Sequence, residues 1–170
     1  MDRCKVGVIG CGDISRVYLH SLTQVFRNTQ VVAVSSRGGE SARRRAAEFD
    51  IPYAVSTEEL LAMEFDIVVI LTDPVSHFRL AEQALLAGKH TYVEKPLAAT
   101  TAEAAHLLTL AREKNLMLTC APDTLLGGGI QTCRKLIDNG LIGTPVASVG
   151  QTFNGGPESW HPNPFFLYQK

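Results

Sequence analysis

The chain has 170 residues, of which 45% are hydrophobic, and 16 basic residues against 17 acidic ones give a formal net charge of −1. This length accommodates one well-buried domain and part of a second. Because the charges nearly balance, there is no electrostatic footprint for nucleic acid or an anionic membrane, and the sequence predicts neither partner.

Short apolar runs typical of buried strands alternate with segments of helical period, which is the pattern of βαβ units with a parallel sheet. Strands are predicted over residues 5–9, 31–35, 66–71, 90–93 and 116–120, with a short one near Tyr53. Helices are predicted over residues 14–26, 40–49, 58–62, 75–87 and 102–114. Right-handed crossovers would join them into a doubly wound α/β sheet, the Rossmann dinucleotide-binding fold.

Local capping chemistry supports several of these boundaries. Ser56 with Glu59, and Thr100 with Glu103, have the capping-box spacing ahead of an apolar helical run. Gly88 follows a helical segment and predicts a helix end.

The first predicted strand runs directly into a glycine turn at residues 10–15, followed by a helix. Gly10 can make the tight turn, and Gly12 allows a pyrophosphate to approach the backbone beside the helix amino terminus. Ser15 stands where the fingerprint has a third glycine or alanine, and the alternative is a plain turn. The candidate cofactor-binding residues here are Gly10, Gly12, Asp13 and Ile14.

The end of the second strand carries Ser36 and Arg37, where an NAD site would place an acid for the ribose 2′-hydroxyl. A hydroxyl and a guanidinium suit a 2′-phosphate, so the sequence predicts NADP, with NAD possible. The run 43–45 is three arginines, but adjacent helical residues point in different directions. A solvated helix face is therefore favoured for this run over an extension of the phosphate site.

Two further strand ends supply candidate residues, because ligands of open α/β sheets bind at the carboxyl edge. Thr72 and Pro74 follow one strand and would line the nicotinamide side, while His77 could either touch the ligand or serve in packing. Lys95 follows another strand, and Pro96 holds it in extended geometry. Lys95 is therefore directed at the ligand edge.

These motifs resemble the Gfo/Idh/MocA family of nicotinamide-dependent oxidoreductases, and the segment from residue 87 to Glu94-Lys95-Pro96 is the most specific of them. The resemblance implies that Lys95 lies beside the substrate and nicotinamide and helps deprotonate the reacting hydroxyl. It also implies that Glu94 is a positioning group, that a cis bond precedes Pro96, and that the substrate is a sugar, cyclic polyol or related compound.

The sequence predicts two domains, a Rossmann domain over residues 1–122 and the start of an incomplete substrate domain over residues 123–170. A strand is expected over 144–153, and exposed apolar surface over 144–170 predicts self-association. The expected function is hydride transfer between a nicotinamide cofactor and a hydroxyl or carbonyl group, with little turnover by this chain alone. The alternative is a non-catalytic dinucleotide-binding or scaffold module.

The four cysteines lack the paired spacing of a zinc site or a redox dithiol, so no metal site is predicted. No apolar run approaches membrane-spanning length, and the amino terminus passes directly into a strand. The predicted location is the cytoplasm.

Overall fold

The computed structural model of the protein describes residues 3–122, 124–151, 153, 155–156 and 158. Contacts within the chain divide it into two compact units, Met1–Asp123 and Thr124–Lys170. The assignment of the second unit to a substrate domain stays a prediction.

The first unit is built on one parallel sheet, which confirms the predicted fold class. Its strand order is β3-β2-β1-β4-β5-β6, and every neighbouring pair is parallel. The chain therefore begins at β1 inside the sheet, adds β2 and β3 on one side, and then adds β4, β5 and β6 on the other, as in a doubly wound dinucleotide-binding sheet. The strands are β1 (Cys4–Ile9), β2 (Thr29–Ser35), β3 (Tyr53–Val55), β4 (Ile67–Ile70), β5 (His90–Val93) and β6 (Leu118–Cys120).

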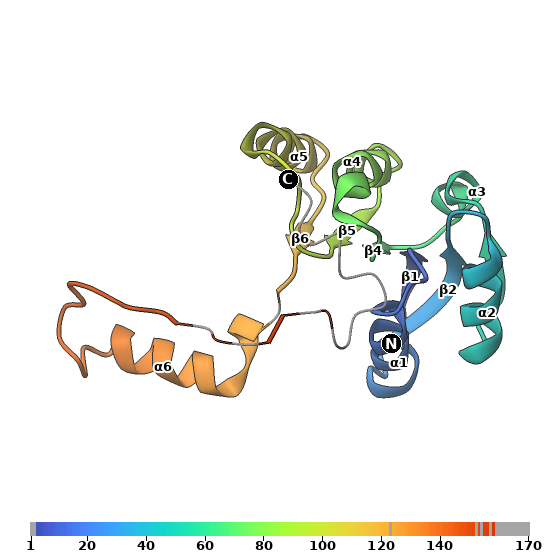
Figure 1. Ribbon diagram of the computed structural model, residues 1–170. Coiled ribbons are helices and arrows are strands. Elements are labelled where there is room, and N and C mark those ends of the chain that lie inside the picture. The colour runs from blue at the N-terminus through green and yellow to red at the C-terminus, as the bar shows by residue number, and fades with distance from the viewer. Residues whose placement is uncertain (1–2, 123, 152, 154, 157, 159–170) are drawn as a thin grey trace. The chain divides into compact units, whose positions relative to one another are not determined.

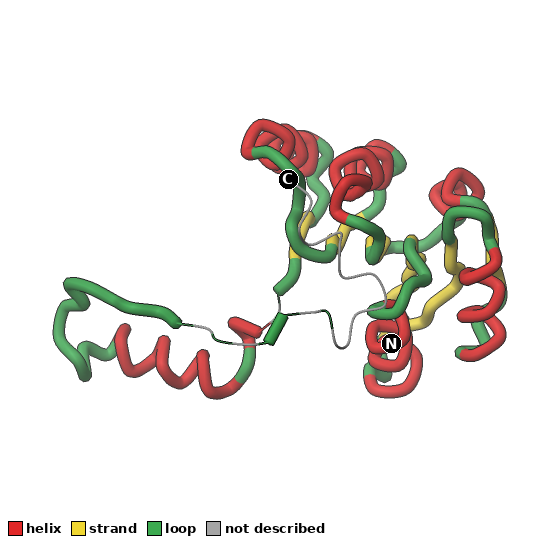
Figure 2. The backbone as a smooth tube through the Cα atoms, in the orientation of Figure 1, coloured by secondary structure: helices red, strands yellow, loops and turns green. Residues whose placement is uncertain are grey.

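Helices cover both faces of this sheet, with α4 and α5 on one side and α1 on the other (Figure 1). Figure 2 shows the strands gathered between these helices. The helices are α1 (Ser15–His20), α2 (Glu40–Glu48), α3 (Thr57–Ala62), α4 (His77–Leu86) and α5 (Thr101–Glu113).

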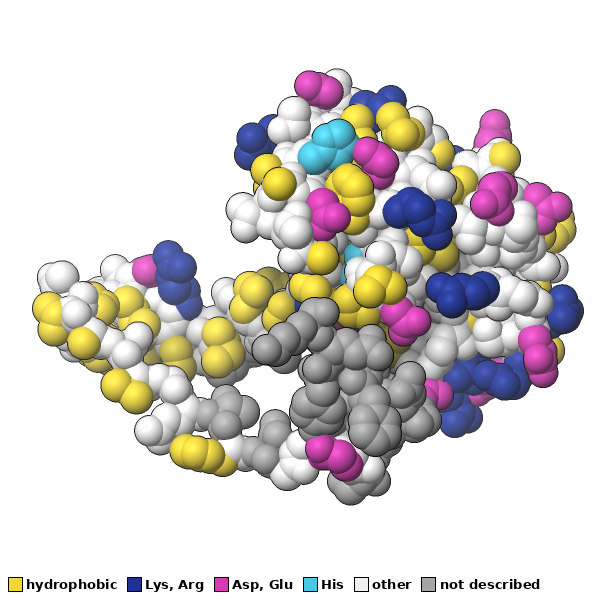
Figure 3. Space-filling model, turned by 45° about the horizontal axis from the view of Figure 1, so that its top comes forward, with side chains coloured by type: hydrophobic (Ala, Val, Ile, Leu, Met, Phe, Trp, Pro, Cys, Tyr) yellow, Lys and Arg dark blue, Asp and Glu magenta, His cyan; other side chains and the backbone are white. Residues whose placement is uncertain are grey.

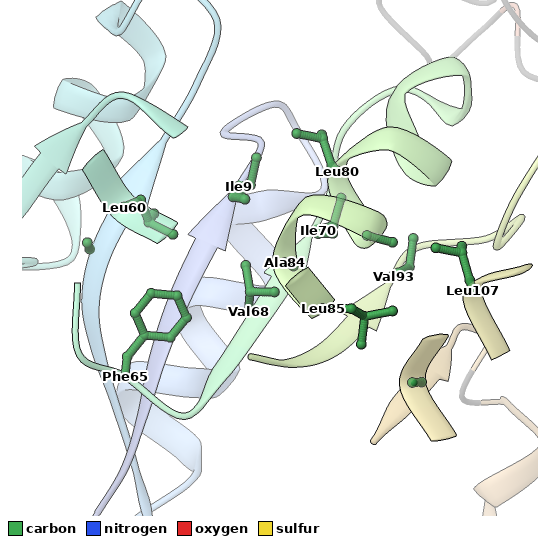
Figure 4. Close-up of a cluster of buried hydrophobic side chains, with 13 residues drawn as sticks. Ile9, Leu60, Phe65, Val68, Ile70, Leu80, Ala84, Leu85, Val93 and Leu107 are labelled. Atoms are coloured by element: carbon green, nitrogen blue, oxygen red, sulfur yellow. The ribbon is translucent and has the colours of Figure 1, made fainter. Parts of the chain in front are cut away.

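Strand alternation divides the core into two clusters, one on each face. On β1, Val6 and Val8 pack with Leu19 of α1, whereas Ile9 packs on the opposite face with residues of α3, α4 and α5. Figure 4 shows the second cluster, in which Leu85 of α4 lies close to Val93 of β5. Each fully buried leucine or valine contributes about 1.5–3 kcal/mol, so both helical layers are held firmly against the strands.

Both predicted capping boxes are confirmed, because Ser56 with Glu59 and Thr100 with Glu103 exchange reciprocal hydrogen bonds at the starts of α3 and α5. The predicted helix end at Gly88 is also confirmed by its left-handed φ of 76°.

Two predicted helices differ from the structure. The segment 14–26 is α-helical only over α1 and continues as a π-helical turn, η1 (Ser21–Val25). The Ser21 and Thr23 hydroxyls donate to the carbonyls of Val17 and Leu19, four residues back, and such bonds compete with regular helix geometry. The helix predicted over 75–87 begins with a 3₁₀ turn, η2 (Pro74–Ser76), before α4.

The second unit carries the 3₁₀ turn η3 (Thr124–Leu126) and the helix α6 (Gly128–Asp138). The strand predicted over 144–153 is wrong for its described residues, 144–151 and 153, which form no strand. A strand needs a partner for its backbone groups, and no described strand pairs with this run. Residues 152 and 159–170 lie outside the described part of the chain. Within the described part, no helix is long and apolar enough to span a membrane.

Candidate functional site

The predicted site residues follow neighbouring strands at the carboxyl edge of the sheet. Backbone hydrogen bonds fix this edge: Gly10 N–H donates to Ser35, Leu71 N–H to Ile9, and Glu94 N–H to Ile70, over 2.7–2.9 Å. The turn after β1 therefore lies between the end of β2 and the loop after β4, and the loop after β5 comes next. This adjacency brings the glycine turn, the Ser36 loop, the Thr72 loop and the Lys95 loop to one edge of the molecule.

The two glycines of the turn have different physical roles. Gly10 has a φ of +102°, and a Cβ there would lie 2.6 Å from the Leu71 carbonyl carbon, so both backbone conformation and space require glycine. Among the residues that the structure describes, a Cβ on Gly12 would meet nothing within 4 Å. Gly12 therefore borders open space on an exposed turn, which fits the close approach of a phosphate group to the backbone. Asp13 and Ile14 of the same turn are also exposed.

The loop after β2 presents Arg37 to solvent, and no hydrogen bond or ion pair engages its side chain among the described residues. The Ser36 Oγ instead accepts a hydrogen bond of 3.0 Å from Ala42 N–H in α2. Ser36 thus closes the loop onto the helix, while the Arg37 guanidinium stays available for a phosphate.

His77 is fully buried at the start of α4 and joins two of the strand-end loops. Its Nδ1 lies 2.7 Å from the Pro96 carbonyl oxygen, and its Nε2 lies 2.9 Å from the Thr72 carbonyl oxygen. The Thr72 hydroxyl also accepts a hydrogen bond of 2.7 Å from the hydroxyl of Ser76. Ser76 lies in the 3₁₀ turn η2, which begins at Pro74. These contacts favour a positioning role for His77 over direct contact with a ligand.

The carboxylate of Glu94 is held from two sides. Tyr18 of α1 donates to Glu94 Oε1 over 2.8 Å, and the Lys95 N–H donates to Glu94 Oε2 over 2.9 Å. Tyr92 adds a 3.3 Å contact between the two tyrosine hydroxyls. Burial, with the hydrogen bonds to Tyr92 and Glu94, raises the pKa of Tyr18, which keeps its hydroxyl a donor.

The Lys95 side chain is exposed, and it has no ion-pair partner among the described residues. The peptide bond between Lys95 and Pro96 is cis, as predicted. Lys95 is therefore an accessible ammonium on a loop whose backbone is fixed by Glu94 and, through the Pro96 carbonyl, by His77. Such a group can stabilise negative charge developing on an oxygen or transfer a proton to it.

The structure also corrects the prediction for the arginine run. Arg43 and Arg44 are exposed, but Arg45 is only 8% exposed and contacts the glycine turn. No local sequence signal marks Tyr18 and Tyr92, because only the packing of α1 beside β5 brings them to Glu94. Burial raises the pKa of Cys11, inside the turn, to about 11, so this thiol stays protonated at neutral pH.

Comparison with known proteins agrees with this geometry. Residues 4–121 match the Gfo/Idh/MocA family, described as an oxidoreductase family with an NAD-binding Rossmann fold. The match covers the entire sheet and the strand-end loops that carry the predicted site residues. The chain belongs to this family.

Relatives of this family member include reductases and dehydrogenases of nucleotide-linked sugars. A dTDP-3,4-didehydro-2,6-dideoxy-α-D-glucose 3-reductase of Streptomyces violaceoruber is 35% identical over 91% of the chain and 45% of its own length. The solved UDP-N-acetylglucosamine 3-dehydrogenase of Acidithiobacillus ferrooxidans superimposes with a TM-score of 0.73 at 33% identity, over 79% of the chain and 42% of its own.

A variant of a 3-ketoreductase from Actinomadura kijaniata, solved in complex with TDP-benzene and NADP, gives a TM-score of 0.75 at 32% identity. That superposition covers 84% of the chain and 46% of the other protein. The chain thus spans less than half the length of these relatives.

Proposed function

We propose that this chain forms the NADP-binding portion of an oxidoreductase that transfers hydride between the cofactor and a hydroxyl or carbonyl group of a sugar or related polyol. The observation that carries the proposal is that a glycine turn and an accessible lysine lie at the same sheet edge, with only the Thr72 loop between them. The sugar substrate is supported by the names of the relatives, which act on dTDP- and UDP-linked sugars.

The residues present fit a dinucleotide. Gly12 borders open space among the described residues, so the turn can receive a pyrophosphate against its backbone. The turn residues 10–14 would hold the pyrophosphate, and Ser36 and Arg37 would lie at the 2′-phosphate. Thr72, Pro74, Glu94 and Pro96 would flank the nicotinamide, and bound NADP would supply the hydride donor or acceptor.

Lys95 is the proposed catalytic residue. As hydride leaves the carbinol carbon, the hydroxyl loses its proton; the Lys95 ammonium would stabilise the negative charge on that oxygen, whereas the neutral amine would take the proton. Glu94 would hold the Lys95 backbone in place through its 2.9 Å hydrogen bond, and His77 would hold the Pro96 carbonyl. Both act as positioning residues.

The preference for NADP is tested by titrating the chain with NADPH and NADH and following nicotinamide fluorescence. We expect NADPH to bind more tightly, and Arg37→Ala to weaken NADPH binding by about tenfold or more, since hydrogen bonds to charged groups contribute about 1.5–3 kcal/mol. The same variant should change NADH binding less than twofold. Arg27→Ala, an exposed arginine before β2, is the matched control. Tenfold tighter binding of NADH by the unaltered chain would refute the preference.

A non-catalytic dinucleotide-binding module is the second candidate. One observation favours it: among the described residues, no side chain that could transfer a proton forms a hydrogen bond or an ion pair with the Lys95 side chain. The two candidates predict different outcomes when the protein is given a keto sugar and NADPH. Turnover that Lys95→Ala abolishes would identify the enzyme, whereas tight binding of NADPH with no turnover in a protein that includes the relatives' remaining length would identify the module.

The proposed compartment is the cytoplasm. All four cysteines are free thiols, a state typical of reducing compartments.

A further inference from the structure

Arg45 is a charged side chain that the fold buries against the glycine turn. It comes from α2, thirty residues away in sequence, and is 8% exposed, whereas its neighbours Arg43 and Arg44 are exposed. A buried charge is costly unless it is paired and hydrogen-bonded, so the partners of this guanidinium indicate what it does.

Those partners lie in the turn and on α2. Arg45 Nε donates to Ser15 Oγ over 3.1 Å, and Nη2 donates to the Gly12 carbonyl oxygen over 3.3 Å. Nη1 donates to Glu48 Oε2 over 2.6 Å, and Glu48 also accepts from Arg16 Nε over 2.7 Å. The group of two guanidinium ions and one carboxylate carries a net positive charge beside the proposed pyrophosphate site.

Ser15 links this arginine to the turn. The Ser15 side chain is fully buried, and its hydroxyl donates to the Gly12 carbonyl oxygen. The Ser15 Oγ in turn accepts a hydrogen bond from Arg45 Nε. Ser15 is the residue that departs from the usual glycine or alanine of the dinucleotide fingerprint. A buried hydroxyl needs hydrogen-bond partners, and Arg45 is one of those of Ser15. Ser15, Arg45 and the Gly12 carbonyl therefore form one hydrogen-bonded unit.

The unit fixes one peptide plane of the turn. The Gly12 carbonyl accepts hydrogen bonds from both Ser15 and Arg45, so it points into the protein. In a trans peptide the C=O and the following N–H point in opposite directions. The N–H of Asp13 is therefore directed away from Arg45, on the exposed side of the turn, where an anion could accept from it.

We infer that Arg45 is a positioning residue of the dinucleotide-binding turn: acting through Ser15 and the Gly12 carbonyl, it holds the Asp13 N–H toward the cofactor pyrophosphate. This inference rests on the proposed function. It differs from a purely structural role, in which Arg45 would only fasten α2 beside α1 and would not affect one part of the ligand more than another.

The test compares NADPH with adenosine 2′-monophosphate, which has the 2′-phosphate but no pyrophosphate. Arg45→Met should weaken NADPH binding at least tenfold and change binding of adenosine 2′-monophosphate less than twofold. Arg44→Met, which removes an exposed charge from the adjacent position, should leave both within twofold. Equal weakening of both ligands, or unchanged NADPH binding in folded Arg45→Met, would overturn the inference.

A second variant covers the case in which Arg45→Met does not fold. Ser15→Ala should weaken NADPH binding at least threefold without affecting adenosine 2′-monophosphate. In a double-mutant cycle with Arg45→Lys, the combined loss should be smaller than the product of the single losses, because the residues act as one unit. Multiplicative losses would contradict this. If the unaltered chain binds neither NADPH nor NADH, the proposed function fails and the inference with it, whereas normal binding by every variant refutes only the inference.

Discussion

The turn after β1 contains two glycines, Gly10 and Gly12, that are needed for different reasons. Gly10 is required by the protein itself, because its left-handed φ and the nearby backbone of Leu71 leave no room for a side chain. None of the described residues requires glycine at position 12, since a Cβ there would meet no described atom within 4 Å. The contrast separates a residue that the fold needs from one that the proposed ligand needs.

Alanine at each position tests this separation. Gly10→Ala should lower the free energy of unfolding by about 2–4 kcal/mol, since it combines backbone strain with overpacking. Gly12→Ala should leave stability within about 0.5 kcal/mol but weaken NADPH binding, because the added methyl group stands where the pyrophosphate approaches. Chemical denaturation and NADPH titration of both variants measure the two effects, and equal loss of stability would contradict the assignment.

At the scale of the elements, short local signals set where helices begin, and neighbouring strands set where loops meet. The α5 helix begins at a capping box whose two hydrogen bonds, 3.2 Å and 3.0 Å long, join Thr100 and Glu103. The loop that carries Lys95 ends at this cap, so the cap also fixes one end of the proposed catalytic loop.

Removal of the cap has a defined cost. Thr100→Ala should lower the free energy of unfolding by about 1 kcal/mol, the usual loss for an N-cap hydroxyl. Thr101→Ala is the matched control, because Thr101 is exposed and is the first helical residue rather than the cap. Thermal unfolding of both variants measures the difference, and equal midpoints would show that the cap does not contribute.

At the scale of the whole chain, the two units differ in how they bury apolar surface. The first has a core on each face of its sheet. The described residues of the second leave large apolar side chains exposed, spread over its surface in Figure 3 and including Ile130, Leu136, Val146, Val149 and Phe153. Exposed apolar surface of this extent is typical of an interaction surface.

Self-association through residues 144–170 stays a prediction that sedimentation velocity can test. The 170-residue chain should form larger species as its concentration rises, and a chain without residues 144–170 should do so much less. Val146→Ser with Val149→Ser in the full chain is the matched control, because it keeps the length and removes two exposed valines. Identical sedimentation of all three proteins would contradict the prediction.

The sequence by itself determined the sheet, most helix boundaries and the residues at its carboxyl edge. These depend on local signals: buried apolar runs, capping boxes, and a glycine turn between a strand and a helix. Lys95 was identified in the same way, since a strand end followed by proline is a local pattern. The strand expected over 144–153 failed because a strand also needs a partner, which a local apolar pattern does not specify.

Only the tertiary structure decided how the side chains of the site are held. Tyr18 reaches Glu94 across 76 residues, Arg45 reaches the glycine turn across 30 to 33, and His77 bridges two strand-end loops. Helical period shows which way a side chain points but not what lies there, so Arg45 was expected in solvent and is buried. The sequence determined which groups are present at the edge, and the packing of α1, α2 and α4 determined their hydrogen-bond partners.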